Sequence, residues 1–113
     1  MFSNADGSVI CQTTQLDTTH ETLCVSDKAR AAQPECNPKD ILIPAIAIQD
    51  KFVNLKCWNQ GFEQPERLSP FQVRRHGSAT IIPGFSGSLY VFDSARFALI
   101  RAGERNAVIF GKR

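Results

Sequence analysis

The chain has 113 residues, of which 42% are hydrophobic and 21% are charged. A chain of this length fits one domain with a single modest core, and this composition excludes a largely disordered protein. No apolar run approaches the roughly 18 residues of a membrane-spanning helix, so we expect no membrane span.

The net charge of +2 conceals an uneven distribution. Residues 1–50 contain three Lys/Arg and seven Asp/Glu, a net of −4, whereas residues 51–113 contain ten and four, a net of +6. We therefore expect one β-rich domain over residues 1–113, with an acidic, cysteine-bearing N-terminal half and a basic C-terminal half. Two interpretations stay open: the halves neutralise each other across one core, or the basic half binds an acidic partner.

Four cysteines are many for a chain of this length, and their spacing restricts their use. They are Cys11, Cys24, Cys36 and Cys57. No C-x-x-C pair occurs, so the spacing does not favour a zinc site or a thioredoxin-like motif, and we expect no metal and no cofactor. The even count favours two disulfides. Of the three possible connectivities, Cys11–Cys24 with Cys36–Cys57 closes the short local loops.

Disulfides indicate an oxidising compartment. The first seven residues have neither a basic nor an apolar leader segment. We therefore expect a periplasmic or secreted protein whose leader has been removed. A cytosolic protein with four reduced, buried cysteines is the alternative.

The first expected structure is a β-hairpin. Residues 8–12 and 22–26 contain strand-forming apolar residues next to turn formers, which is typical of two paired strands. The polar residues 13–19 are expected to form a ragged strand and the turn. This pairing places Cys11 opposite Cys24 near the base of the hairpin.

One short helix is expected after the hairpin. Residues 27–33 have helix-forming composition, with Asp27 as the expected N-cap and Pro34 as the residue that ends the helix. The helix has two turns at most, and a loop over residues 35–40 follows.

Two further strands and a long loop precede the basic half. Residues 41–48 are dense in β-branched residues and predict a buried strand, in which Pro44 requires an edge or a bulge because proline donates no hydrogen bond to a neighbouring strand. Residues 52–58 alternate, and one set is uniformly apolar and predicted to face the core: Val53, Leu55 and Cys57. Residues 59–70 form the longest expected loop.

The C-terminal part predicts a β-meander. Short apolar segments alternate with turn residues, a spacing that leaves no room for a long helix. The expected strands are residues 79–82, 88–92, 96–101 and 107–110, and the expected links are residues 83–87, 93–94 and 103–106. Together these patterns predict an all-β fold. It is a small, mostly antiparallel, disulfide-stapled β-barrel or sandwich with at most one short helix.

The sequence contains no convincing catalytic set, so we expect a non-enzymatic protein with no catalytic residues. A thiol nucleophile needs a histidine beside it, but Cys57 lies on the apolar face of its strand and is better explained as a disulfide partner. Arg74 and Arg75, with later arginines and nearby aromatic residues, allow a nucleic-acid platform. The pI of about 8.4 is low for a dedicated binder, so we do not favour this alternative.

Residues 52–110 resemble the periplasmic and membrane-bound inhibitors of c-type lysozyme. The resemblance is carried by the Ser86-Gly87 turn, Tyr90 three residues after the glycine, Phe97 on the next strand, and Arg101-Ala102-Gly103-Glu104. Leu55-Lys56-Cys57 followed by Gly61 resembles the opening strand of that family. The chain departs from the family in three ways. It lacks the closing cysteine, has one residue inserted between the basic residue and the glycine, and has no family counterpart for residues 1–50.

The resemblance implies a small antiparallel β-barrel whose Ser-Gly loop and neighbouring basic residue enter the acidic cleft of a lysozyme. A guanidinium can pair with one carboxylate there while a hydroxyl bonds the other. The implied partner-binding residues are Ser86, Gly87, Tyr90, Arg101 and Glu104. Independently of the family, a hairpin closed at residues 93–94 places the Ser-Gly turn and Arg101 on one rim.

Two other functions remain open. One is a non-enzymatic interaction domain of a secreted or surface assembly that binds through an exposed edge strand. The other is a nucleic-acid-binding basic β-domain. The sequence does not predict the oligomeric state.

Overall fold

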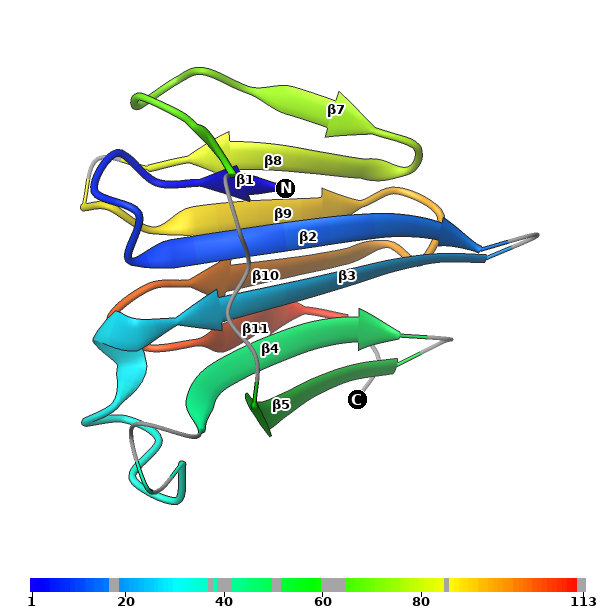
Figure 1. The fold of residues 1–113 in the computed structure, drawn as a ribbon. Coiled ribbons are helices and arrows are strands. Elements are labelled where there is room, and N and C mark those ends of the chain that lie inside the picture. The colour runs from blue at the N-terminus through cyan, green and yellow to red at the C-terminus, as the bar shows by residue number, and fades with distance from the viewer. Residues whose placement is uncertain are drawn as a thin grey trace.

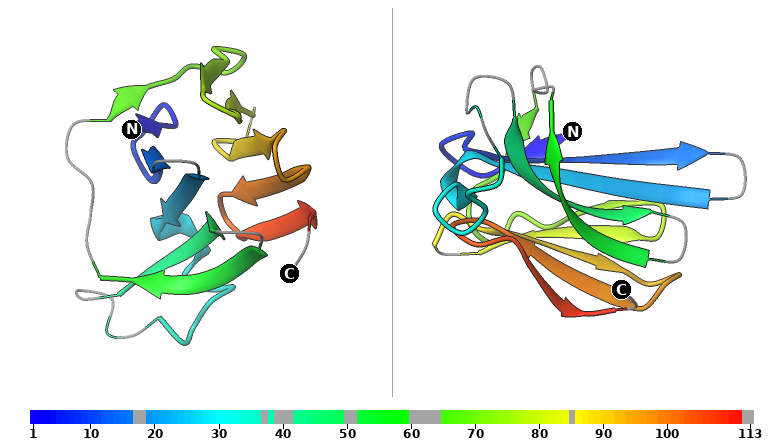
Figure 2. Two further views of the ribbon diagram at one scale, coloured as in Figure 1. Left: turned by 90° about the vertical axis from the view of Figure 1, so that its right-hand side faces the viewer. Right: turned by 90° about the horizontal axis from the view of Figure 1, so that it is seen from below.

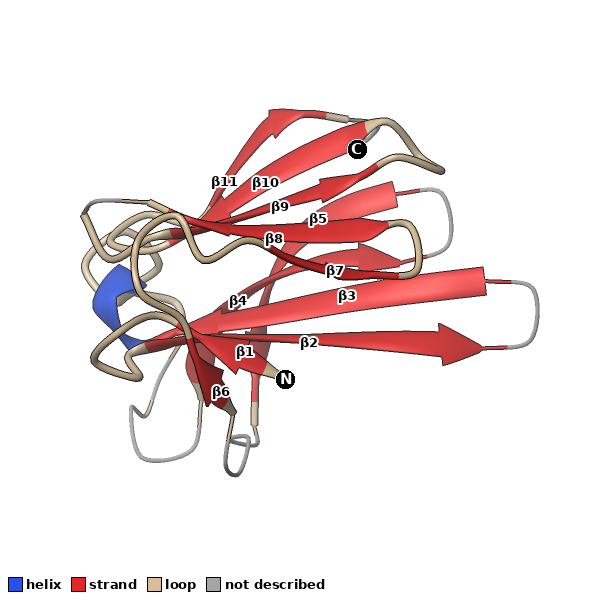
Figure 3. Ribbon diagram, turned by 90° about the horizontal axis from the view of Figure 1, so that it is seen from above, coloured by secondary structure: helices blue, strands red, loops and turns tan. Residues whose placement is uncertain are grey.

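The protein is a β-sandwich of two open sheets that face each other (Figures 1 and 3). This computed structural model describes residues 1–16, 19–36, 38, 42–49, 52–59, 65–84 and 86–111. The prediction of a mostly antiparallel, disulfide-stapled all-β fold is confirmed. The closed barrel implied by the family resemblance is not found, because each sheet keeps two open edges.

The N-terminal sheet has six strands in the order β5-β4-β3-β2-β1-β6. Its bounds are β1 (Phe2–Ser3), β2 (Val9–Leu16), β3 (Thr19–Ser26), β4 (Ile43–Gln49), β5 (Phe52–Trp58) and β6 (Glu66–Arg67). All neighbours are antiparallel except β1 and β6, which are parallel. Strands β2 and β3, which form the expected hairpin, are longer than predicted, because their polar residues also pair with each other.

The C-terminal sheet is the predicted meander, with the order β11-β10-β9-β8-β7. Its bounds are β7 (Arg74–His76), β8 (Ala79–Pro83), β9 (Leu89–Asp93), β10 (Ala98–Ala102) and β11 (Ala107–Phe110). Every second residue of β8, β9 and β10 is buried, the alternation of a strand with one face on a core. The core between the sheets therefore combines these residues with those of the N-terminal sheet, including Val9, Ile46, Ile48, Ile81, Leu89, Val91 and Ile100.

Both disulfides have the connectivity that the loop lengths favour. Cys11 lies directly opposite Cys24 across β2 and β3, and this bridge is part of the core. Cys36 joins Cys57 on β5 and so attaches the segment after β3 to the outer strand of the sheet.

The expected helix over residues 27–33, of two turns at most, is short, as predicted, but Asp27 is not its N-cap. Only one 3-10 turn, η1 (Asp27–Ala29), forms there. Ser26 occupies the N-cap position, and the Asp27 carboxylate accepts a hydrogen bond from Arg30 Nε at 2.8 Å instead of capping the backbone. After η1, the backbone N–H groups of Ala32 and Gln33 donate to the Ala29 carbonyl oxygen, and the segment then reaches β5, to which Cys36 is bonded.

The prediction that Pro44 needs an edge strand or a bulge is also wrong, since β4 lies between β3 and β5. Pro44 pairs with Cys57 on β5, but the pairing of β4 with β3 begins only at Ala45. The proline therefore lies just outside the ladder that its missing N–H would interrupt.

Leu55 does not have the buried position predicted for it. Val53, on the same face of β5, is 3% exposed, whereas Leu55 is 51% exposed. The difference arises because β5 is an edge strand, and the facing C-terminal sheet ends at β11. Alternation sets the face of a side chain but not whether the opposite layer extends far enough to cover it.

Two loop predictions need correction. Glu66 and Arg67, expected within a long loop, pair in parallel with β1. The link between β9 and β10 has four residues instead of two, since Asp93 pairs with Ala98. The buried Asp93 carboxylate accepts hydrogen bonds from the backbone N–H groups of residues 95 and 96, and these bonds fold residues 94–97 into the turn.

Within the described ranges, no helix is long and apolar enough to cross a bilayer.

The disulfides give the first testable prediction. We expect no reactive thiol in the native protein and four after reduction in denaturant. Replacing Cys36 and Cys57 together by Ser should lower the free energy of unfolding by about 2–4 kcal/mol, because the unfolded chain regains the freedom that this loop closure removes. Thiol titration and chemical denaturation measure the two quantities. Reactive thiols in the untreated protein would contradict the assignment.

Candidate functional site

The turns at one end of the sandwich gather side chains from both sheets. At the left-hand end in Figure 1 lie residues 4–8 (blue), η1 (cyan), residues 84 and 86–88 (yellow) and residues 103–106 (orange). Six polar or charged residues of this end form what we call the basic rim: Lys28, Ser86, Ser88, Arg101, Glu104 and Arg105.

The basic rim encloses a hollow of about 270 Å³. It is lined by Ser86, Ser88, Arg101, Glu104 and Arg105. Arg101 pairs with Tyr90 across β10 and β9, a register that brings the end of β10 beside the turn before β9. The prediction that the Ser-Gly turn and Arg101 share one rim is thus correct in geometry, although the hairpin turn is longer than expected.

In the described part of the chain, the two guanidinium groups that line the hollow form no ion pair. Among the described residues, neither Arg101 nor Arg105 has a carboxylate within 4 Å. Ser86 and Ser88 add hydroxyl groups, with their Oγ atoms 3.3 Å apart. Glu104, exposed on the same hollow, contributes an acceptor. The hollow therefore offers two guanidinium groups and two hydroxyls to an incoming carboxylate, and one carboxylate to an incoming donor.

The Ser-Gly turn is held from the opposite sheet. Gly87 has a φ of 82°, a conformation that side chains disfavour. The buried Asn4 donates from Nδ2 to the Gly87 carbonyl oxygen at 2.7 Å. A Cβ atom on Gly87 would lie only 2.6 Å from Lys28 Nζ. The backbone conformation therefore favours glycine at this position, and a Cβ atom would in addition displace the flexible end of Lys28.

Tyr90 supports the turn instead of lining the hollow. It lies on β9 and is partly exposed. A Cβ atom on Gly84 would lie 3.1 Å from the Tyr90 Cε2 atom, so the ring covers the start of the turn. Gly84 N also donates to the Ser88 carbonyl oxygen at 2.8 Å, which closes the turn over residues 84–88.

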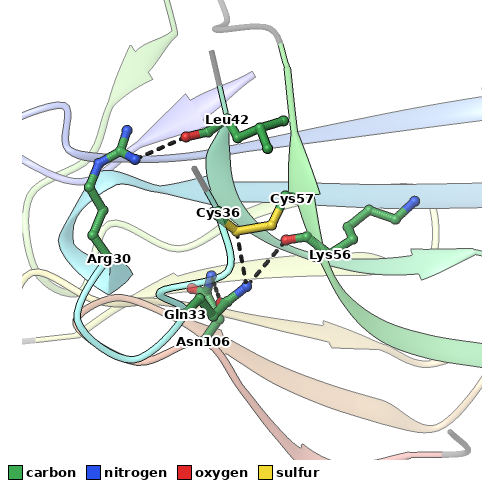
Figure 4. Close-up of a disulfide and its surroundings, with 7 residues drawn as sticks. All are labelled: Arg30, Gln33, Cys36, Leu42, Lys56, Cys57 and Asn106. Atoms are coloured by element: carbon green, nitrogen blue, oxygen red, sulfur yellow. Dashed lines mark hydrogen bonds between the residues drawn. A yellow bond between two sulfur atoms is a disulfide. The ribbon is translucent and has the colours of Figure 1, made fainter. Parts of the chain in front are cut away.

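The turn that carries Glu104 and Arg105 is anchored by a buried amide pair (Figure 4). Asn106 Nδ2 donates to Gln33 Oε1 at 2.8 Å, and Gln33 Nε2 donates to the Lys56 carbonyl oxygen at 3.2 Å. Both amide side chains are 3% exposed. Because Cys36 is bonded to Cys57 beside this pair, the disulfide, β5 and the β10–β11 turn form one connected unit.

A second hollow of about 560 Å³ continues the basic rim towards the N-terminal half. It is lined by Lys28, Ala31, Ala32, Glu104 and Arg105. Sequence reasoning missed Lys28 and Asn4, which lie in the acidic half, and it gave Arg105 no role in the site. No local pattern could have identified Lys28 or Asn4, since they reach the Ser-Gly turn only after the two sheets pack together.

Lys28 is itself positioned by an acidic neighbour. Its Nζ atom lies 3.6 Å from Asp6 Oδ2. Hydrogen bonds from the Ser8 side chain and backbone, with a smaller contribution from Lys28, lower the pKa of Asp6 to about 2. The ionised Asp6 thus holds both the first turn and the cation next to Gly87.

Comparisons with protein-family models, curated proteins and solved structures find nothing that matches this chain.

Gly87→Ala should destabilise the protein by about 1–2 kcal/mol, since a left-handed backbone disfavours a Cβ atom and Lys28 must move. Chemical denaturation measures the change. Gly84→Ala is the matched control, because Gly84 does not have a left-handed backbone and its Cβ atom would lie 3.1 Å from the Tyr90 ring and 3.7 Å from the Ser88 carbonyl oxygen. Equal losses from both substitutions would contradict the special role of Gly87.

Asp6 predicts an acid-dependent loss of stability. Its pKa is lower in the folded protein, so its ionised form stabilises the fold above the ordinary value of 3.8, and this contribution is lost as the pH falls towards about 2. Over that interval Asp6→Asn should lose less stability than the unsubstituted protein, as thermal unfolding at several pH values would show. Parallel stability curves for the two proteins would refute this role.

Proposed function

We propose that this protein is a secreted or periplasmic protein-binding module that inserts the basic rim into an acidic cleft. The most concrete target is a lysozyme-type glycoside hydrolase, which the protein would inhibit. The observation that carries the proposal is the shared hollow of Ser86 and Arg101, with Arg105 on the same hollow. Neither guanidinium has a carboxylate of the described residues within 4 Å.

The chemistry of such a target fits the hollow. Glycoside hydrolases of this type hold two carboxyl groups on opposite sides of the scissile bond. A guanidinium can donate two parallel hydrogen bonds to one carboxylate, while a hydroxyl donates to the other. Because the turns that hold Ser86 and Arg105 are fixed by hydrogen bonds from the N-terminal half, little ordering is required on binding.

The distribution of ion pairs supports an external acidic partner. The ion pairs of the described residues are Lys28–Asp6 and Arg30–Asp27 in the acidic half, and Arg74–Glu66 and Arg96–Asp93 in the basic half. None of these four pairs joins the two halves. The excess positive charge of residues 51–113 is therefore not neutralised by direct contacts with the acidic half in the described part of the chain.

The two disulfides are compatible with an oxidising compartment, which is where a lysozyme-type target acts on cell walls. A nucleic-acid platform has less support. Arg74, on β7, and Arg96, in the turn after β9, are each paired with a carboxylate. Neither residue lines the hollow that holds Arg101.

The proposal is tested by measuring lysis of bacterial cell walls by lysozyme with and without the purified protein. We expect inhibition that saturates with protein concentration. Arg101→Ala should weaken binding by about 2–5 kcal/mol if the pair with the target carboxylate is desolvated, which is about 30-fold or more in the inhibition constant.

Arg75→Ala provides the matched control, because it removes the same charge from an exposed position on β7. It should change the inhibition constant far less than Arg101→Ala. Equal effects would indicate general charge attraction and no specific site. Absence of inhibition by the unsubstituted protein would exclude this class of target.

A further inference from the structure

The side of the sandwich formed by β5 and β11 is strongly apolar. Five large hydrophobic side chains that are exposed by 39% or more lie on or beside these two strands. We call them the apolar strip: Phe52, Leu55, Phe97, Ile109 and Phe110. Figure 2 shows β5 (green) and β11 (red) on the same side of the molecule, where both sheets end.

The apolar strip is continuous across the two sheets. The rings of Phe97 and Phe110 are 5.1 Å apart between centroids. A Cβ atom on Gly111, next to Phe110, would lie 3.2 Å from Val53 Cγ2, so the end of β11 touches the start of β5. A groove of about 390 Å³ runs between the strands and is lined by Val53, Asn54, Leu55, Asn106, Ala107 and Val108.

Two irregularities expose the central residues of this surface. Leu55 lies on the same face as the buried Val53 but extends past the last strand of the facing sheet. Ile109 is the extra residue of a bulge, since Leu99 pairs with Phe110 while Ile100 pairs with Val108. Leu55 and Ile109 therefore leave the sandwich core incompletely covered along this side.

The opposite edges of the two sheets carry charges, and the apolar strip does not. The edge strand β7 consists of Arg74, Arg75 and His76, and the edge strand β6 consists of Glu66 and Arg67. Charged side chains on an edge strand oppose pairing with another chain. The ammonium group of Lys56 on β5 bonds to Gln49 Oε1 at 2.8 Å instead. Among the described residues of β5 and β11, Lys56 is the only charged one, so the described part of the strip does not repel an identical strip.

We propose that the apolar strip is the contact between two copies of this chain related by a two-fold axis. Such a contact requires a surface that matches itself, with the same residues on both sides. An uncharged apolar surface at two adjacent sheet edges meets this requirement, because each copy covers Leu55 and Ile109 of the other.

The exposed apolar area agrees with a dimer. From their exposed fractions, the five side chains present about 400 Å² of apolar surface. A typical homodimer contact buries about 800 Å² on each partner, of which about 65% is apolar, or roughly 500 Å². The strip thus supplies most of the apolar surface that a stable dimer needs, and the walls of the groove add to it.

The dimer leaves the basic rim accessible. Phe110 ends β11, whereas Glu104 and Arg105 precede its first residue, at the other end of the strand. Two basic rims on one dimer would bind a target that presents several acidic sites more tightly than one rim can. The proposal of the dimer does not depend on the proposed function, since its test uses the protein alone.

Sedimentation velocity of the full chain over a wide concentration range tests the proposal. We expect a reversible shift from the mass of one chain to that of two. Leu55→Asp and Ile109→Asp should each raise the dissociation constant by about 100-fold or more, because each places an unpaired carboxylate in an apolar contact. Both positions are about half exposed in the single chain, so both variants should fold, with no reactive thiols and an unchanged circular dichroism spectrum.

Val73→Asp is the matched control, since Val73 is 47% exposed, close to the 49% of Ile109, but precedes β7 at the opposite edge. It should leave the dissociation constant unchanged. A single-chain mass at every concentration would overturn the proposal. So would a dimer that both strip variants leave intact. If the protein remains a single chain but binds an extended apolar peptide at Leu55, the proposal is likewise overturned. The strip would then be a binding surface for a different protein.

Discussion

Hydrogen bonds between the turns of the two sheets determine where everything else in this molecule lies. Asn4 donates to the Gly87 carbonyl, Ser26 to the Gly103 carbonyl, and Asn106 to Gln33. Apolar contacts between sheets have little directional preference, so a sandwich core alone permits the sheets to slide by small amounts. Directional bonds between buried groups remove that freedom, since breaking one leaves an unsatisfied polar group away from water.

The basic rim is a consequence of these bonds. Its residues come from separate turns, and each turn that contributes a cation or a hydroxyl is connected to one of the three bonds. Arg101 is the exception, because it lies on β10 and is fixed by strand pairing. The geometry of the hollow therefore depends on contacts between residues that are distant in the chain, which a local motif such as Ser-Gly does not encode.

The difference between local patterns and contacts between distant residues also explains how much of the structure could be predicted from the sequence. Burial of alternate residues is a local pattern, so β8 to β11 were predicted with errors of one or two residues, whereas the short strand β7 was not among the predicted strands. The short cysteine loops predicted both disulfides. The exposure of Leu55 depends on where the facing sheet ends, and the role of Lys28 depends on how the sheets meet. Pro44 could not be placed for the same reason. A proline fits a central strand here because the pairing of β4 with β3 begins only at the next residue, Ala45.

Two phenylalanines, Phe71 and Phe97, have a left-handed backbone, and of these two it is Phe97 that belongs to the apolar strip. Its φ is 50°, and it is 70% exposed, in a turn where glycine or asparagine would be the less strained choice. A bulky residue in this conformation costs about 1–2 kcal/mol. Ring contacts with Phe92 and Phe110, at centroid distances of 5.9 and 5.1 Å, offset this by about 0.5–1.5 kcal/mol each.

The strain and the contacts at Phe97 thus nearly cancel, so stability of the single chain gives little reason for this residue. Its ring nevertheless adds exposed apolar surface beyond the end of the strands, next to Phe110. Phe97 belongs to the apolar strip, and the strip is the surface on which we expect a second chain. An exposed aromatic ring in a strained turn is best understood as part of a contact that is completed by another molecule, because only there does the ring leave water.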